Sequence, residues 1–119
     1  MNHDKRILYG EIWLVRFDPS VGHEFQKERP AIVIQSNVQI RKSNLLSVVP
    51  LTSNNSKVLP DDILIKKTTQ NHLLTDSVVK VYSIVSYDYS RFINKIGFAD
   101  LKILNEIKQY LRKHFDLLK

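Results

Sequence analysis

The chain has 119 residues, 43% of them hydrophobic and 25% charged, which suits one globular domain over residues 1–119. It contains no cysteine, so disulfides, thiolate metal sites and cysteine nucleophiles are excluded. Its formal net charge of +6 favours anionic partners, nucleic acid first, although many small basic domains have no such partner.

The N-terminus lacks the apolar stretch of a signal peptide. No apolar run approaches the about 18 residues that a membrane-spanning helix needs. We therefore expect a cytoplasmic protein without a membrane partner.

Segments rich in β-branched and aromatic residues predict five strands, with a polar loop or turn after each. The predicted strands are residues 9–17, 30–36, 45–52, 62–66 and 77–85. The first loop, residues 20–29, is long and polar, and Pro30 is expected to open the strand that follows it. Residues 88–91 are expected to form one helical turn.

The C-terminal segment has the apolar spacing of an amphipathic helix. Its stripe consists of Leu101, Leu104, Ile107, Leu111, Phe115 and Leu118. Asp100 is the expected N-cap, and Gly97 is expected to mark the break before the helix. Strands followed by one helix predict an α+β, mainly β protein, or a small β-barrel with a C-terminal helix.

Several chemistries lack their sequence signature. The four histidines form no metal-binding pair, so no metal site is expected. Three glycines in the whole chain do not make a phosphate-binding loop, and there is no nucleophile elbow. Polar residues remain at strand ends, where functional groups often lie.

Metal-free RNA cleavage matches the residue types at these strand ends. The 2′-hydroxyl of RNA is the nucleophile, so the protein must move protons and stabilise a phosphorane. Arg29 suits the phosphorane, Thr52 can donate a hydrogen bond, and His23 and Glu24 can transfer protons. Each has a structural alternative: Arg29 in a surface ion pair, Thr52 closing a turn, and His23 simply solvated.

Five short motifs follow one another along the chain: Gly10-Glu11-Ile12-Trp13, Asp18-Pro19, Gly22-His23-Glu24, Arg29-Pro30-Ala31 and Pro50-Leu51-Thr52-Ser53. In this order and at these spacings they resemble the MazF/PemK family of toxin endoribonucleases, the mRNA interferases of type II toxin–antitoxin systems. The resemblance implies a compact SH3-like β-barrel of the CcdB/MazF type, acting as a homodimer without a cofactor. It also implies sequence-specific, metal-independent cleavage of single-stranded mRNA to 2′,3′-cyclic phosphate and 5′-hydroxyl ends. That cleavage would inhibit translation and growth until a cognate antitoxin neutralised the toxin.

The resemblance assigns roles to individual residues. Arg29, Thr52 and Glu24 fall on the family's catalytic positions. The expected RNA contacts are His23, Lys27, Ser53, Asn54, Ser86 and Asp88.

One stretch departs from the family pattern. Ser83 and Val85 replace the usual glutamine and basic residue, while Asp88 keeps its place. Tyr87 and Tyr89 are candidates for stacking on bases or for core packing. Val85 leaves open a catalytically degenerate member that binds RNA or antitoxin. Because the same fold also serves toxins that act by protein contact, a CcdB-like toxin that poisons DNA gyrase is a second alternative.

Overall fold

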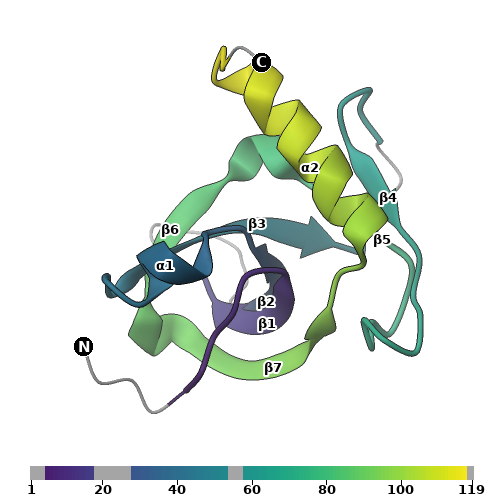
Figure 1. Cartoon of the computed structure of the whole chain (residues 1–119). Coiled ribbons are helices and arrows are strands. Elements are labelled where there is room, and N and C mark those ends of the chain that lie inside the picture. The colour runs from purple at the N-terminus through teal and green to yellow at the C-terminus, as the bar shows by residue number, and fades with distance from the viewer. Residues whose placement is uncertain (1–4, 18–27, 54–57, 118–119) are drawn as a thin grey trace, which may run out of the picture.

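The computed structural model describes residues 5–17, 28–53 and 58–117, and Figure 1 shows their arrangement. Its strands are β1 (Glu11–Arg16), β2 (Glu28–Val33), β3 (Leu45–Thr52), β4 (Ile63–Ile65), β5 (Ser77–Val79), β6 (Val85–Asp88) and β7 (Phe92–Phe98). Its helices are α1 (Asn37–Ile40), α2 (Leu101–His114) and the 3₁₀ turns η1 (Val81–Ser83) and η2 (Tyr89–Arg91).

The strands form one antiparallel, strongly curved sheet, visible in Figure 1 as ribbons that bend around a common centre. β3 pairs with β2 on one side, and on its other side with β6 near its start and β5 near its end. β2 continues to β1 and then β7. The mixed α+β fold with a C-terminal helix is confirmed.

The curved sheet of the expected small barrel is not closed in the described residues. Closure would need β6 to pair with β7, and among the described residues no ladder joins these two edge strands. The η2 turn separates them, and the Tyr89 N–H that starts it donates to the Asn44 carbonyl, 2.6 Å away. This bond holds the end of β6 against the β3 side of the sheet.

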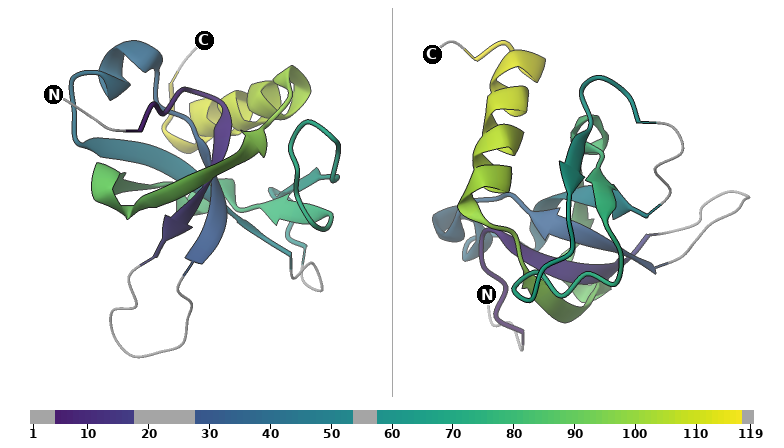
Figure 2. Two further views of the ribbon diagram at one scale, coloured as in Figure 1. Left: turned by 90° about the horizontal axis from the view of Figure 1, so that it is seen from below. Right: turned by 90° about the vertical axis from the view of Figure 1, so that its right-hand side faces the viewer.

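Buried side chains gather in two clusters, one on each face of the sheet, because successive side chains of a strand alternate. The inner cluster is Ile7, Trp13, Val15, Ala31, Val33, Ile40, Leu46, Val48 and Phe92. The helix-side cluster is Ile12, Ile32, Val49, Leu51, Ile63, Ile65, Leu73, Val79, Val81, Ala99, Ile103, Leu104 and Ile107. In the right panel of Figure 2, α2 lies beside the β4–β5 pair, and its apolar face completes the second cluster.

The motif at residues 10–13 has a structural role. Gly10 has a φ of 89°, a left-handed conformation that favours glycine. The Glu11 carboxylate is nearly buried, and its Oε1 accepts from the Leu8 N–H and the Trp13 indole N–H, each at 2.9 Å. Its Oε2 lies 3.2 Å from Lys95 Nζ of β7. One carboxylate therefore joins the N-terminal segment, β1 and β7.

The single strand expected over residues 77–85 is wrong. The chain leaves extended geometry at Lys80, with φ −92° and ψ 78°, and forms η1 before β6 begins. Lys80 Nζ lies 2.6 Å from Asp62 Oδ2, and its backbone N–H donates to the Pro50 carbonyl. These contacts turn the chain from the edge beside β4 toward α2.

Two further elements were not predicted from the sequence. Helix α1 is a single turn capped by Ser36 Oγ, and β7 has too little apolar alternation to stand out. Gly97 lies within β7 and does not mark a break before the helix. A side chain there would place its Cβ 2.5 Å from the Asn71 carbonyl oxygen, so this close approach of two backbones requires glycine.

Helix α2 begins as predicted, with Asp100 Oδ1 accepting from the Ile103 N–H at 3.0 Å. Its buried residues are Ile103, Leu104 and Ile107. The predicted stripe is therefore only partly correct, because Leu101 is 71% exposed and Phe115, 51% exposed, follows the helix. Leu118 lies outside the described residues. None of the described helices is long and apolar enough to cross a membrane.

Candidate functional site

Two prolines end the ladder between β2 and β3. The outermost pair is Ala31 with Pro50, and Pro30 comes next on β2. Because proline has no N–H to donate, the pairing does not extend beyond this point. The strand ends that carry Arg29 and Thr52 therefore lie just past the last bonded pair.

Arg29 and Thr52 lie on the same face of the sheet. Each is two residues beyond a member of the Ala31–Pro50 pair, and side chains two apart share a face. Both residues are half-buried. Arg29 pairs with Val15 of β1, and Thr52 pairs with Val78 of β5, so a ladder on its far side supports each of them.

Aromatic side chains adjoin the guanidinium. The Arg29 Cζ lies 5.8 Å from the centre of the Phe17 ring. Phe17 meets Tyr87 of β6 edge to face at 5.0 Å, and the Arg91 Cζ lies 5.5 Å from the Tyr87 ring. Arg91 Nη1 also donates to the Arg16 carbonyl at 3.2 Å.

Sequence reasoning missed Phe17 and Arg91 as neighbours of the site. It had left Tyr87 between base stacking and core packing, and the ring packs against the inner cluster. The alternation of Val85 and Tyr87 was a usable signal, since both lie on the inner face of β6. The contact between Phe17 and Tyr87 had no sequence signal, because β1 and β6 are not paired.

Ser86 and Asp88 lie on the opposite face of β6 and are not brought to Arg29. Ser86 Oγ is 2.9 Å from Ser47 Oγ on the paired strand. Asp88 Oδ2 accepts from the Ser90 N–H at 2.9 Å and so caps η2. Both side chains, predicted as RNA contacts, therefore bond to neighbouring groups of the fold.

Ser53 lies at a groove of about 510 Å³. The groove is lined by Leu14, Pro30, Leu51, Ser53, His72, Leu73, Leu74, Thr75, Ser77 and Ile96. Pro30 and Leu51 alternate with Arg29 and Thr52, so the groove is on the other face of the same strands. Ser53 is thus separated from its neighbour Thr52. His23, Glu24, Lys27 and Asn54 lie outside the described residues.

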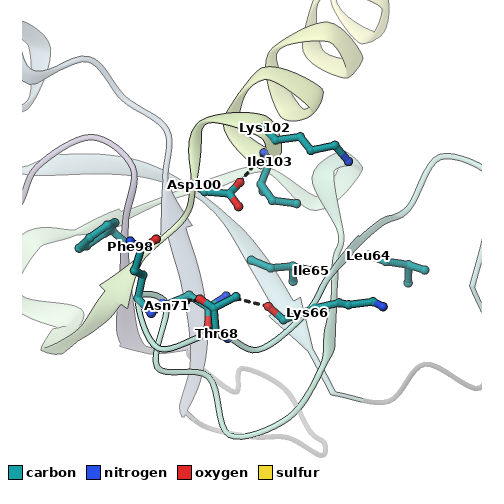
Figure 3. A pocket seen from close by; sticks show the side chains of 10 residues that line it. Leu64, Ile65, Lys66, Thr68, Asn71, Phe98, Asp100, Lys102 and Ile103 are labelled. Atoms are coloured by element: carbon teal, nitrogen blue, oxygen red, sulfur yellow. Dashed lines mark hydrogen bonds between the residues drawn. The ribbon is translucent and has the colours of Figure 1, made fainter.

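A second, smaller cavity of about 250 Å³ lies between β4, the turn at residues 68–71 and the start of α2. Figure 3 shows two of its polar side chains, Asp100 and Asn71, bonded to backbone groups around it. Asp100 caps the helix, and Asn71 Nδ2 donates to the Lys66 carbonyl at 2.8 Å. No predicted site residue lines this cavity, and its Asp100 and Asn71 side chains serve the fold.

Lys80, on the far side of the sheet from Arg29, forms an ion pair with Asp62. The hydrogen bond from Lys80 to the Asp62 carboxylate raises the pKa of the ammonium above its ordinary value of 10.5. The Asp62 side chain is fully buried. This pair lies next to α2 and connects η1 to the segment before β4. In the described parts of the chain, no three His, Asp or Glu side chains gather as a metal site would require.

Comparison with known proteins bears on both fold and family. Residues 9–115 match the model of the PemK-like, MazF-like toxin family of type II toxin–antitoxin systems. Endoribonuclease MazF9 of Mycobacterium tuberculosis is 34% identical over 113 residues, covering 91% of this chain and 95% of the relative. Endoribonuclease MazF2 of Mycobacterium bovis is 31% identical over 114 residues, covering 93% and 98%.

Solved structures share the fold. MazF from Deinococcus radiodurans superposes with a TM-score of 0.79 at 25% identity, covering 96% of this chain and 100% of that one. A MazE–MazF complex from the same organism superposes with a TM-score of 0.75 at 20% identity, covering 97% and 100%. The family model and the curated relatives show that the chain belongs to the PemK-like, MazF-like toxin family of type II toxin–antitoxin systems.

Proposed function

We propose that this protein is a sequence-specific, metal-independent endoribonuclease toxin in which Arg29 and Thr52 act on one scissile phosphate. The observation that carries the proposal is that both side chains lie on one face of the sheet, at the strand ends just past the last bonded pair, Ala31 with Pro50. The curated relatives are named endoribonucleases, which favours RNA cleavage over gyrase poisoning.

The chemistry follows from the residue types. The RNA 2′-oxygen forms a bond to phosphorus and loses its proton to a base, while the bond from phosphorus to the 5′-oxygen breaks. A second proton goes to that 5′-oxygen, leaving a 2′,3′-cyclic phosphate and a 5′-hydroxyl. The Arg29 guanidinium donates to the phosphorane oxygens in a planar fork, and the Thr52 hydroxyl donates one further hydrogen bond.

Glu24 and His23 are proposed for proton transfer, and Lys27, Ser53 and Asn54 for RNA contact, as the motifs imply. Ser86 and Asp88 are weaker candidates because their side chains bond within the fold. The bond between Ser86 and Ser47, and the bond from the Ser90 N–H to Asp88, give both residues a structural role without RNA.

The proposed partners are single-stranded mRNA, a cognate antitoxin and a second copy of the chain. Similar structures contain a MazF with its MazE, and a mycobacterial endoribonuclease with its antitoxin. The net charge of +6 suits both RNA and an acidic antitoxin segment. We place the activity in the cytoplasm, where mRNA is the substrate.

The test uses purified protein, a long single-stranded RNA and excess EDTA. Cleavage at a recurrent short sequence with cyclic phosphate ends is expected, with loss of about 10²-fold or more in Arg29→Ala. Arg112→Ala, on the exposed side of α2, is the matched control and is expected to cleave normally. Binding without cleavage would support a degenerate member. Loss of activity in EDTA would refute metal independence, and DNA damage with RNA intact would favour gyrase.

A further inference from the structure

His72 lines the groove of about 510 Å³ and has an unusual backbone conformation. Its φ of 55° lies in the left-handed region, which few residues other than glycine adopt. The His72 N–H donates to the Thr68 carbonyl at 3.1 Å. Asn71 Oδ1 accepts from the Thr68 and Leu73 N–H groups at 2.9 and 3.0 Å, which closes the turn. A residue held in a sparsely populated conformation by its surroundings is a candidate for function.

The imidazole of His72 has a fixed tautomer. Its Nδ1 lies 2.9 Å from the Ile96 carbonyl oxygen of β7. Because a carbonyl oxygen can only accept, Nδ1 of the neutral ring carries the hydrogen and Nε2 carries the lone pair. In the described parts of the chain this is the one hydrogen bond of the ring. Nε2 is therefore an acceptor that the fold itself does not use.

The bond at Nδ1 also has a structural role. It holds the turn against the outer edge of β7, where the Phe98 N–H donates to the Gln70 carbonyl at 3.3 Å. That role accounts for one nitrogen of the ring and leaves the other unexplained.

Apolar side chains form much of the groove beside this acceptor. Leu51, Pro30, Leu14 and Ile96 come from β3, β2, β1 and β7, which are adjacent strands in that order. The volume is within the range of small-molecule pockets, about 300–1,000 Å³, which are mainly apolar with a few polar groups. A nucleobase, which is flat and has apolar faces, matches a groove of this kind.

The groove begins beside the two residues proposed to act on the phosphate. Pro30 follows Arg29, and Ser53 follows Thr52. Consecutive Cα atoms are only about 3.8 Å apart. Because the groove is on the other face of these strands, RNA reaches it by passing around the strand ends, where the ladder stops. A base next to the scissile phosphate is thus the part of the RNA that can enter.

The polar groups of the groove indicate which base fits. His72 Nε2 accepts, whereas the hydroxyls of Ser53 and Thr75 can each donate. Adenine and cytosine present the complementary pattern, an amino donor beside a ring nitrogen that accepts. Guanine and uracil present a carbonyl beside a ring N–H, which would set one acceptor against another.

We propose that His72 is a specificity-determining residue, whose Nε2 accepts a hydrogen bond from the amino group of an adenine or cytosine in this groove. This inference rests on the proposed function, because it takes the scissile phosphate to lie at Arg29 and Thr52. His72 contacts the base and takes no part in proton transfer.

The first experiment maps the 5′ ends that wild type, His72→Asn and Gln70→Ala produce on a long single-stranded RNA. Asparagine also adopts left-handed backbone, so His72→Asn removes the imidazole with little strain. The wild type should require adenine or cytosine at one position adjoining the cut. His72→Asn should weaken that preference about fivefold, the value of one hydrogen bond, and keep the others. Gln70→Ala, in the same turn but outside the groove, should cut like the wild type.

A change in the substrate tests the same contact without altering the protein. In a short RNA with one cleavage site, purine riboside replaces the adenosine, or pyrimidin-2-one riboside the cytidine, which removes the amino group alone. The kcat/KM of the wild type should fall about fivefold, whereas His72→Asn should cleave both RNAs equally. Full wild-type activity on the analogue would overturn the inference, even if His72→Asn proved unstable. An equal fall in His72→Asn would assign the amino group to another residue and overturn it too.

The outcomes separate this inference from the proposed function. Wild-type cleavage without an adenine or cytosine preference beside the cut, or with that preference intact in His72→Asn, would overturn the inference alone. Wild-type protein that does not cleave RNA would overturn both. Analytical ultracentrifugation covers the other occupant: a monomeric His72→Asn beside a dimeric wild type would assign the groove to a contact between subunits and overturn the inference.

Discussion

Removing the Glu11 carboxylate should be the most damaging polar substitution outside the candidate site. In Glu11→Ala, the Leu8 N–H and the buried Trp13 indole N–H both lose their acceptor. A hydrogen bond to a charged group contributes about 1.5–3 kcal/mol. Two such losses predict a decrease of about 3–6 kcal/mol in the free energy of unfolding.

Glu11→Gln is the matched control. Its amide oxygen can still accept from both donors, which now bond to a neutral group. The ion pair with Lys95 is lost, but Lys95 is 49% exposed, and such pairs are worth at most about 1 kcal/mol. We therefore expect a decrease of about 1–2 kcal/mol for Glu11→Gln.

Urea unfolding followed by the fluorescence of Trp13, the single tryptophan, measures both values. All variants must be compared at one protein concentration, since dimerisation adds to apparent stability. Equal losses for the two variants would refute the reasoning, because only Ala leaves the donors without an acceptor. Losses below about 1 kcal/mol in both would refute it as well.

Three further predictions concern the scaffold. Gly97→Ala should destabilise by about 1–3 kcal/mol in urea unfolding, because the new Cβ meets the Asn71 backbone; a neutral effect would contradict that contact. Asp100→Ala should cost about 1 kcal/mol and lower the melting temperature, whereas Asp100→Asn should restore most of it, since Asn also caps. Because the bond to Asp62 raises the pKa of Lys80, this ion pair should add to the free energy of unfolding. Its contribution is fully present below pH 10.5 and is lost as the pH rises through the higher pKa of Lys80 in the folded protein. In the double variant Lys80→Met/Asp62→Asn, the free energy of unfolding should no longer show this fall at alkaline pH. The same pH dependence in the double variant and the wild type would contradict the prediction.

The sequence predicted most strands because their apolar composition is local information. β3 has the predicted bounds, and the start of α2 follows from Asp100. The break at Lys80 was not predictable, since an ion pair to the distant Asp62 accompanies it. The need for glycine at position 97 was not predictable either, because it comes from the close approach of Asn71, 26 residues away along the chain.

The candidate site was predictable to a different degree. The proline after Arg29 and the proline before Thr52 were both visible in the sequence, but only the register shows that they end one ladder together. Because neighbouring side chains of a strand point to opposite faces of the sheet, Thr52 and Ser53 lie on different faces. The contacts that link Phe17, Tyr87 and Arg91 need the curvature of the sheet, which residue patterns do not encode.

Single-turnover RNA cleavage in EDTA by four proteins tests the central claim most directly: the wild type, Arg29→Ala, Thr52→Ala and the double variant. If Arg29 and Thr52 act on one phosphate, both single variants should be much slower. The double variant should then be far less impaired than the product of the two single effects. Full activity in either single variant, or a double variant as slow as that product, would contradict a shared phosphate site.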